Sequence, residues 1–512
     1  MRNSFFKLIL PHTRMASSAK KLKLSAPSTS SENKSKIDDF MNQIQKRREE
    51  TAESIINFNF NKKRVRIISQ EQMLDDNEYL CTGIVYWMSR DSRVQDNWAF
   101  LFAQKLALKN EVPLHVCFCL IAKYLDASVR QFHFLIKGLE KVAAECKKLN
   151  ISFHLLEGSG AEALPQWIVD HKIGAVVCDF NPLRVPMSWL DGAKKKFKKN
   201  VPLIQVDTHN VVPCWVASDK QEYSARTIRN KINSKLDEYL TEFPPVIKHP
   251  YTSQFEPEPI DWDEAIESRE ADKSVGPIEW AAPGYDNAVK VLKSFLDTRL
   301  KVFATKRNDP TQDALSNLSP WFHFGQISVQ RVALCVQEYK KKYTESVNAY
   351  LEESIVRREL ADNFCASAWA QKTLDDHRKD KRTHIYTLEQ LSKAQTHDDL
   401  WNSAQIQLVK EGKMHGFLRM YWCKKILEWT PSPEDALKYA IYLNDHYSVD
   451  GRDPSGYGCM WSICGIHDQG WAERAVFGKI RYMNYEGCKR KFSIPTFVAR
   501  YGGKVHKYVA KK

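Results

Sequence analysis

Gly83-Ile84-Val85-Tyr86-Trp87 is the first of three runs that decide the fold; the others are Asn97-Trp98-Ala99-Phe100-Leu101-Phe102 and Pro113-Leu114-His115-Val116-Cys117-Phe118. The first and third runs are short, continuous and apolar, which is typical of buried strands. The middle run opens an amphipathic helix. A strand, a helix and a strand in this order predict a crossover unit with two parallel strands.

The same alternation continues along the chain. Further strands are expected at residues 152–156, 175–179 and 202–206, with helices between them. This pattern predicts a doubly wound, mostly parallel sheet covered on both faces, an α/β domain of Rossmann-like type. No G-x-G-x-x-G follows the first strand, so dinucleotide binding of the Rossmann kind is not supported. The turn at residues 88–93 lies where such a sheet binds ligands, although a capped polar loop explains it equally well.

The composition and pattern of the sequence change after residue 212. Scattered acids and a group of prolines indicate an irregular connector: Pro244, Pro245, Pro250, Pro257 and Pro259. From Gly284 to Tyr501 helical periodicity dominates and strand signals vanish. The predicted division is a tail at 1–55, an α/β domain at 56–212, a connector at 213–283 and an all-α domain at 284–512.

Composition excludes some functions and leaves others open. The 512 residues carry a net charge of +14, which fits a polyanionic partner, but a solvated basic face explains it as well. No apolar run approaches the roughly 18 residues that a membrane span requires, so no membrane association is expected. The 12 cysteines contain no C-x-x-C pair, so neither a metal site nor a disulfide framework is expected.

The first residues of the chain are basic, with no acid before Glu32. A mitochondrial transit segment is one interpretation, although Pro11 would end its helix early. In the other, translation starts at Met15 and residues 20–23 (KKLK) form a nuclear signal. We therefore expect a location in the nucleus, with the mitochondrion as the alternative, and a disordered chain before about Ile55.

Three tryptophans have a regular spacing, because Trp401, Trp422 and Trp429 differ by multiples of seven. Seven residues advance a helix by about 10.5 Å and nearly preserve its face, so Trp422 and Trp429 share a stripe. Such a stripe can carry an electron between indoles, but a plain core stripe is the simpler interpretation of the pattern. Gly412 and Gly416 indicate that Trp401 lies on a different helix.

Residues 350–356 (YLEESIV) and the following Arg357-Arg358-Glu359 combine an apolar stripe with charges. Glu353 and Arg357 are i, i+4 neighbours, so a salt-bridge ladder on the helix surface is one interpretation. A carboxylate facing a ligand is the other. In residues 456–461 (GYGCMW), the glycines indicate a close backbone approach, and Trp461 has the type of ring that stacks on bases.

Several longer segments resemble class II cyclobutane pyrimidine dimer photolyases, in the photolyase/cryptochrome superfamily. Residues 350–364 (YLEESIVRRELADNF) resemble the first signature of that family, and residues 465–484 (GIHDQGWAERAVFGKIRYMN) resemble the second. Residues 412–430, 222–232 and 318–327 match as well, and the likeness extends from about residue 60 to the end. The resemblance implies an α/β antenna domain followed by a helical domain that binds FAD in a U-shaped conformation.

The resemblance also implies roles for individual residues. For the FAD phosphates and the rest of the cofactor it implies Tyr223, Arg226, Asn317, Leu318, Ser319 and Gln326. At the isoalloxazine it implies Arg419 and Trp422, with Asn444 facing flavin N5. It implies a photoreduction chain made of Trp422, Trp401 and Trp429, with Tyr386 nearby and the order left open. A second antenna chromophore of the deazaflavin type is an open alternative.

For the substrate, the resemblance implies UV-damaged double-stranded DNA. Glu353 would contact the carbonyl and N3 edge of a thymine, and the rest of the pocket would be Arg307, Asn308, Met420, Trp461 and Asp468. The implied reaction is light-driven transfer of an electron from reduced FAD to a dimer flipped out of the duplex, after which the cyclobutane ring splits. Contacts with the DNA backbone are expected from Lys379, Lys381, Arg382, Lys489, Arg490 and Lys491, and we expect a monomer.

Two other functions remain open at this point. A cryptochrome-type flavoprotein without repair activity is the first, but no long signalling tail follows Tyr501, and Glu353, Trp461 and Asp468 favour repair. A nucleotide-activating enzyme built on the α/β domain is the second, although that domain has neither an H-I-G-H-like motif nor a P-loop.

The sequence departs from the family's pattern at two places. After Cys365 only three residues, Ala366-Ser367-Ala368, precede Trp369, where the family has a longer aromatic stretch. The family also has one more residue between Tyr457 and Gly458. Both places lie near the expected active-site helices, so they bear on the contacts with FAD or with the lesion.

Overall fold

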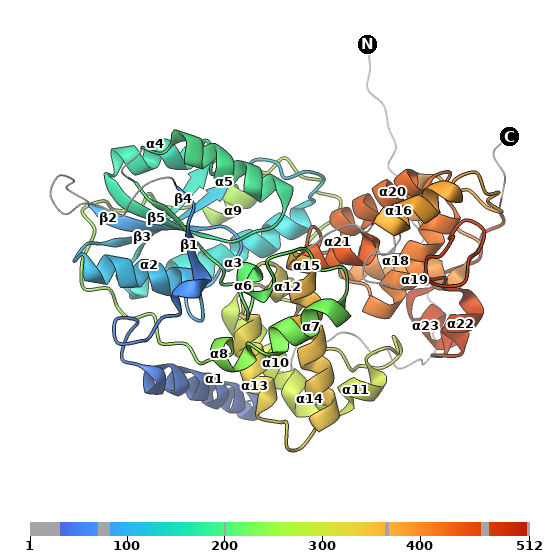
Figure 1. The fold of residues 1–512 in the computed structure, drawn as a ribbon, viewed down its shortest axis with the longest axis horizontal. Coiled ribbons are helices and arrows are strands. Elements are labelled where there is room, and N and C mark those ends of the chain that lie inside the picture. Colours follow the sequence, from blue (N-terminus) through green and yellow to red (C-terminus); the bar gives the residue numbers. More distant parts are fainter. Residues whose placement is uncertain (1–30, 70–81, 199–200, 364–367, 462–469, 509–512) are drawn as a thin grey trace, which may run out of the picture.

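The computed structural model describes residues 31–69, 82–198, 201–363, 368–461 and 470–508. An α/β unit lies at one end of the molecule and the last helices of the chain lie at the other (Figure 1). In the described residues the sheet has the strand order β1-β6-β5-β2-β3-β4, in which β1 runs antiparallel to β6 and the other pairs are parallel. The strands are β1 (Val65–Ile67), β2 (Gly83–Met88), β3 (Leu114–Leu120), β4 (Ser152–Glu157), β5 (Ile173–Asp179) and β6 (Leu203–Val206).

Side chains of β2 alternate between two apolar cores. Ile84, Tyr86 and Met88 pack into a core that also contains apolar residues of α2 and α3. Val85 and Trp87 pack into a second core, with residues of α4 and α5. The predicted mostly parallel sheet with helices on both faces is therefore confirmed. These helices are α2 (Trp98–Lys109), α3 (Val129–Lys148), α4 (Ala163–Asp170) and α5 (Arg184–Lys196).

The connector is irregular, as its prolines predict, and contains only short helices among its described residues. They are α6 (Cys214–Ala217), α7 (Ala225–Asn233), α8 (Leu236–Tyr239) and α9 (Trp262–Glu267). The helical unit then comprises α10 (Tyr285–Ser294), η2 (Phe295–Arg299), η3 (Leu300–Val302), α11 (Phe303–Lys306), α12 (Ser319–His323), α13 (Val329–Gln337), α14 (Thr344–Leu351), η4 (Glu352–Arg357), α15 (Arg358–Asp362), α16 (Ala368–Asp376), α17 (Leu388–Ser392), α18 (Asp399–Glu411), α19 (Gly416–Glu428), α20 (Pro433–Tyr447), α21 (Pro454–Trp461), α22 (Tyr485–Lys489) and α23 (Ile494–Tyr501). Two of these, η2 and η4, are π-helical turns.

The expectation of a disordered tail up to residue 55 is wrong for its second half, because Ser31–Thr51 form helix α1. Phe40 and Ile44 are buried in the core of the helical unit. With Ile37 and Met41 they follow the helical spacing i, i+3, i+4, i+7. The signal is present in the sequence, but the many Lys, Glu and Ser residues around it conceal it. A short 3₁₀ turn, η1 (Lys62–Arg64), follows before β1.

A buried ion cluster joins α1 to both units of the molecule. Asp96 lies just before α2 and is fully buried, and both of its oxygens accept hydrogen bonds from Arg48 of α1, at 2.9 and 2.7 Å. Arg331 of α13 donates to the same two oxygens at 3.1 and 2.9 Å. Burial alone would raise the pKa of Asp96, but the two guanidinium groups outweigh it and hold that pKa well below its usual range.

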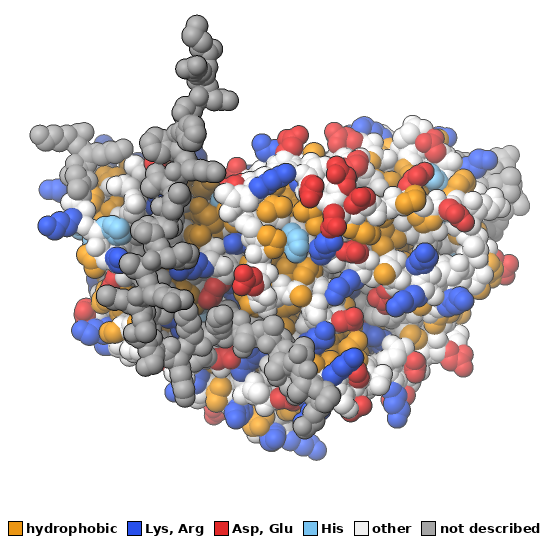
Figure 2. All heavy atoms as spheres, turned by 180° about the vertical axis from the view of Figure 1, so that it is seen from behind, with side chains coloured by type: hydrophobic (Ala, Val, Ile, Leu, Met, Phe, Trp, Pro, Cys, Tyr) orange, Lys and Arg blue, Asp and Glu red, His pale blue; other side chains and the backbone are white. Residues whose placement is uncertain are grey.

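The charges on one face of the molecule are mixed. Figure 2 shows basic and acidic side chains interspersed over the described residues of that face, so the net positive charge is not gathered into one patch there. None of the helices in the described part of the chain has both the length and the apolar composition needed to cross a membrane.

Replacing Asp96 by asparagine should destabilise the protein strongly. Asp96→Asn leaves buried Arg48 without its counter-charge and removes one of the two carboxylate partners of Arg331, a loss on the order of 3–5 kcal/mol. The change should lower the midpoint of urea unfolding. It should also expose the segment after α1 to limited proteolysis, because α1 loses its anchor on the α/β unit.

Glu50→Gln is the matched control, since Glu50 pairs with Lys46 on the exposed surface of the same helix. Its effect should stay within about 0.5 kcal/mol. The role given to this cluster would be refuted if the Asp96→Asn protein had the same unfolding midpoint and the same protease resistance as the Glu50→Gln protein.

Candidate active site

Three tryptophans of the helical unit are in contact in the order Trp422, Trp401, Trp429. The rings of Trp401 and Trp422 are nearly parallel, with centres 6.0 Å apart and planes at 6°. The rings of Trp401 and Trp429 are 5.8 Å apart at 64°. All three side chains are buried. The spacing in the sequence leaves this order open, whereas the structure puts Trp401 of α18 between Trp422 in α19 and Trp429 at its end.

Hydrogen bonds fix the orientation of the indole rings of Trp401 and Trp422. Trp401 Nε1 donates to the backbone oxygen of Trp422 at 3.1 Å, and Trp422 Nε1 donates to Gln405 Oε1 at 3.0 Å. Asp398 caps α18 by accepting from the backbone N–H of Trp401. Because both indole donors are satisfied inside the core, each ring is held in one orientation.

Tyr386 continues this series beyond Trp429. Its ring centre lies 5.6 Å from that of Trp429, and its hydroxyl is 2.7 Å from Nδ1 of His397. Burial, together with nearby His384 and Lys425, lowers the pKa of His397 to about 4. At neutral pH the imidazole is therefore uncharged, and its Nδ1 shares one hydrogen bond with the Tyr386 phenol. The contacts thus run from Trp422 in the core to Tyr386.

A group of charged and polar side chains lies beside the same helix. Arg419 of α19 approaches Asp450, with Nη2 and Oδ1 3.5 Å apart. Ahead of this helix, Lys413 Nζ donates to Asn317 Oδ1 at 2.7 Å. Asn317 has a φ of +62°, in the left-handed region that asparagine tolerates better than most residues. The turn that begins at Asn317 is thereby tied to the segment leading into α19.

The electrostatics of this group favour a bound anion. The pKa of Lys413 is lowered to about 8, mainly by burial; Arg419 and Arg299 also lower it, and Asp450 opposes them. An anionic group placed here would relieve the repulsion between these cations and stabilise the charged form of Lys413. Ser319 Oγ, at the start of α12, is sealed from solvent and has no hydrogen-bond partner among the described residues.

Two adjacent glutamates in η4 have different surroundings. Glu352 receives two hydrogen bonds from Arg229 of α7, at 2.9 and 2.7 Å, and a third from Arg357 at 3.3 Å. The ladder expected between Glu353 and Arg357 is therefore wrong: the π-helical turn places Arg357 beside Glu352, five residues earlier. Glu353 is left 48% exposed, with its carboxylate 3.9 Å from Nε of Arg307. Two of the predicted lesion residues are thus brought together.

Other predicted cofactor residues lie elsewhere. Tyr223 is 60% exposed, and Arg226 is also exposed, at the beginning of α7. Gln326 is fully buried, but its amide already binds backbone on both sides, accepting from the N–H of Gly284 at 2.6 Å and donating to the oxygen of Phe134 at 3.0 Å. Gln326 therefore joins α3 to the helical unit.

The remaining predicted residues are distributed around the same helices. Leu318 is buried in the apolar core of the helical unit, Met420 is partly buried on α19, and Asn308 is exposed beside Arg307. Asn444 is buried on α20, which packs against α19. The side chain of Trp461, all of Asp468 and the short segment after Cys365 lie outside the described residues. Among the expected DNA-backbone contacts, Arg382 donates instead to backbone oxygens of the protein.

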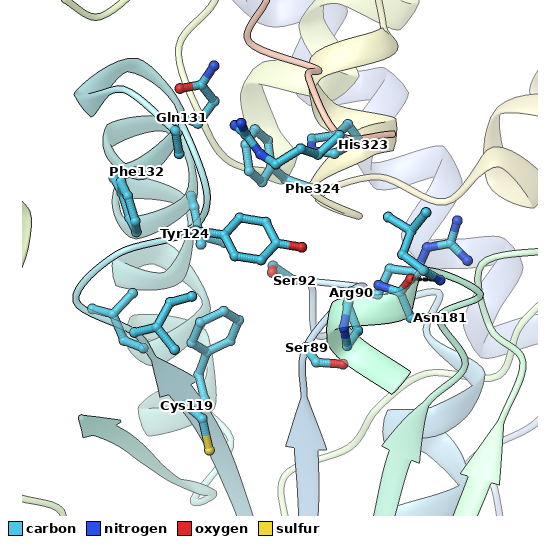
Figure 3. Close-up of a pocket in the computed structure, with 18 of the residues that line it drawn as sticks. Ser89, Arg90, Ser92, Cys119, Tyr124, Gln131, Phe132, Asn181, His323 and Phe324 are labelled. Atoms are coloured by element: carbon cyan, nitrogen blue, oxygen red, sulfur yellow. Dashed lines mark hydrogen bonds between the residues drawn. The ribbon is translucent and has the colours of Figure 1, made fainter. Parts of the chain in front are cut away.

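A cavity lies between the two units, at the carboxyl ends of the parallel strands (Figure 3). Ser89, Arg90 and Ser92 line it, so the turn after the first strand borders the kind of site predicted for it. The ring of Tyr124 points into the middle of the group drawn in Figure 3. The helical unit contributes His323, Phe324, Arg452, Asp453 and Pro454.

Comparison with known proteins identifies the family. The sequence profile of the DNA photolyase family matches residues 84–248. A deoxyribodipyrimidine photo-lyase from Potorous tridactylus is 58% identical over 466 residues, which are 89% of this chain and 87% of that protein. A deoxyribodipyrimidine photo-lyase from Arabidopsis thaliana is 49% identical over 437 residues, covering 81% of this chain and 88% of the relative.

The chain belongs to the DNA photolyase family. The resemblance inferred from the sequence is therefore confirmed. The fold agrees: a class III photolyase from Agrobacterium tumefaciens superposes with a TM-score of 0.65 at 17% identity, covering 83% of this chain and 87% of the other.

Members of this family bind FAD, and the side chains present here fit that cofactor. Lys413, Arg419 and the unpartnered hydroxyl of Ser319 are the cations and donors that a pyrophosphate requires. The sequence did not lead us to assign Lys413 or Asp450 to the cofactor site, although Lys413 lies in segment 412–430, which resembles the family. The signal available was a lysine between two glycines just before an aromatic-rich helix.

Trp401→Phe should interrupt the photoreduction of oxidised flavin. Because Trp401 is the contact between the other two indoles, its loss should abolish most flavin reduction under blue light, measured as bleaching of oxidised-flavin absorbance. Repair by protein that has been reduced chemically beforehand should continue. Trp98→Phe, at a buried tryptophan of the α/β unit, is the control and should photoreduce normally. If the Trp401→Phe protein photoreduced its flavin as efficiently as the wild type, the contact order would be excluded as the electron route.

Proposed function

We propose that the protein repairs cyclobutane pyrimidine dimers in DNA with light. Its relatives of 49–58% identity are deoxyribodipyrimidine photo-lyases, which are carbon–carbon lyases. The observation that carries the proposal is the position of Glu353. The π-helical turn gives the structural ion pairs to Glu352 and leaves Glu353 beside Arg307 and open to solvent. π-helical turns of this kind are frequent at functional sites.

The roles of the side chains follow from this arrangement. FAD supplies the photochemistry, because in its reduced form it is a light-excitable one-electron donor. Glu353 offers carboxylate oxygens to the N3–H of a thymine, and Arg307 offers donors to a carbonyl or phosphate oxygen. The electron that enters the dimer returns after both bonds between the two bases have broken, so the reaction consumes no net reductant. The tryptophan series restores the reduced cofactor after oxidation.

Damaged double-stranded DNA must present the dimer outside the helix to reach Glu353. Flipping costs least where the bases are already poorly stacked, as at a dimer, and this difference contributes to selectivity. The buried tryptophans and the exposed pair of Glu353 and Arg307 therefore serve separate steps, reduction of the cofactor and recognition of the lesion.

Glu353→Gln should slow repair while FAD stays bound. The amide keeps the shape of the side chain but loses the charge-assisted hydrogen bond, which is worth about 1.5–3 kcal/mol, or roughly a tenfold to hundredfold loss. Dimer loss from a dimer-containing oligonucleotide, per dose of blue light, measures it in chemically reduced protein. Glu345→Gln, at an exposed glutamate of α14, is the control.

The same assay separates repair from a photoreceptor function. Wild-type protein that holds FAD but removes no dimers under light would contradict the repair proposal and favour a cryptochrome-like regulator. A Glu353→Gln protein that has lost FAD would instead mean that Glu353 belongs to the cofactor site.

We also propose that the cavity between the two units holds a second, antenna chromophore of the deazaflavin type. Aromatic side chains suited to a planar ring line it, namely Phe118, Tyr124, Phe132, Trp189 and Phe324. Arg90 and Arg452 supply positive charge. The flavin-containing protein should absorb additional light when supplied with a deazaflavin, and Tyr124→Ala should reduce that binding. Unchanged spectra in a titration of the wild type would contradict the assignment.

A further inference from the structure

Asp445 is a buried carboxylate next to Asn444 on α20, and three hydrogen-bond donors converge on it. Asn444 Nδ2 donates to Asp445 Oδ1 at 3.0 Å. The backbone N–H of Arg452 donates to the same oxygen at 2.9 Å, and the Tyr457 hydroxyl donates to Oδ2 at 2.9 Å. Asn444 is 1% exposed and Asp445 is 5% exposed, so water does not compete for these bonds.

The chemistry of these partners fixes which end of the Asn444 amide faces Asp445. The N–H of Arg452 can only donate. Burial and the neighbouring Asp445 raise the pKa of Tyr457, so its phenol keeps its proton and also donates. Asp445 Oδ1 therefore acts as an acceptor, and the group of Asn444 that meets it must be the NH₂. The amide oxygen of Asn444 is turned away from Asp445.

Asp445 is itself held in place from both sides. Its backbone oxygen accepts from Arg452 Nη1 at 2.8 Å and from Gln131 Nε2 of α3 at 3.1 Å. The backbone at Gly451 passes so close that an added Cβ would lie 2.8 Å from the Cα of Asp445. Arg452 has a φ of +66°, which completes this tight loop. Asp445 thus has little freedom to release Asn444.

We propose that Asp445 is a positioning residue that makes the amide oxygen of Asn444 the group offered to flavin N5. The inference rests on the proposed function and on the family resemblance, which implies that Asn444 faces N5. An oxygen acceptor pairs with the N–H that N5 carries in reduced flavin. In oxidised flavin N5 carries only a lone pair, which an oxygen repels. Asp445 therefore favours the reduced cofactor, the form that repairs DNA.

Asp445→Ala is the direct test, because it removes the oxygen that holds the NH₂ of Asn444; in an amide variant the Arg452 N–H would keep an oxygen at the same place. Asn444 is then free to turn its NH₂ towards oxidised flavin. The ratio of reduced to oxidised flavin at a fixed potential should fall about tenfold, which corresponds to about 30 mV for a two-electron couple. Spectroelectrochemical titration of the flavin-containing protein measures this ratio.

Tyr457→Phe is the matched control. It removes a donor from Asp445 Oδ2 but leaves the bond to Asn444, so the flavin potential should equal that of the wild type. An unchanged potential in Asp445→Ala protein that retains FAD would overturn the proposal. A shift of equal size in both variants would also overturn it, because Asp445 would then act only by placing α21.

A measurement on unaltered protein covers the case in which Asp445→Ala does not fold. Flavin-free wild-type protein is titrated with oxidised FAD and with a FAD analogue that has C–H in place of N5. An amide oxygen at this position predicts that the analogue binds as tightly as FAD or more tightly, because the repulsive lone pair is gone. Binding about tenfold weaker would mean that NH₂ faces N5, and would overturn the proposal.

The two proposals fail in different ways. Wild-type protein that binds no FAD, or that binds it and repairs no dimers, contradicts the proposed function. Wild-type protein that repairs dimers, with a flavin potential insensitive to Asp445→Ala, contradicts only the role of Asp445.

Discussion

Asp96 is the acceptor around which the two units of the molecule are arranged. A carboxylate without a cation in the interior costs several kcal/mol, so the folded chain must bring Arg48 and Arg331 to it from segments far apart in sequence. Arg331 also pairs with Glu242, which draws the connector to the same point. One buried charge thus sets how α1, the loop before α2 and α13 lie relative to one another.

A second buried ion pair joins the α/β unit to the part of the helical unit that contains the candidate active site. Arg90, in the turn after β2, binds Asp362 of α15 through two hydrogen bonds of 2.8 and 2.9 Å. The helix that ends at Asp362 continues directly from η4, where Glu353 lies. The α/β sheet therefore positions the turn that carries Glu353 through one guanidinium–carboxylate pair. Arg90 also lines the cavity between the units. Its pair with Asp362 therefore fixes the position of the sheet relative to both the cavity and η4.

The sequence predicts the sheet well because each buried strand is a local, continuous apolar run. Gly83 to Trp87 can be assigned without knowledge of any partner. The tryptophan order cannot be predicted in this way, because Trp401 reaches Trp422 and Trp429 by packing of α18 on α19, a long-range event. The resemblance supplied the identities of these residues. Helix α1 lay within reach of pattern analysis, since Ile37, Phe40 and Ile44 have helical spacing, but its charged surroundings hid the apolar stripe.

Residue type alone also could not separate Glu352 from Glu353. The i, i+4 rule pairs Glu353 with Arg357, and it fails because one π-helical turn moves the pairing by a single residue. The extra residue in the turn gives the ion pairs to Glu352 and leaves Glu353 exposed beside Arg307. A local distortion of the backbone, which side-chain periodicity does not reveal, thus decides which carboxylate is held by ion pairs and which is open to solvent.

The departure from the family's pattern after Tyr457 can be located against the hydrogen bonds of Asp445. The three donors to its carboxylate come from Asn444, Arg452 and Tyr457, all on the amino-terminal side of the change. Helix α21 runs from Pro454 through the altered position to Trp461 without a break in its backbone. The shorter sequence therefore leaves the anchoring of Asn444 intact.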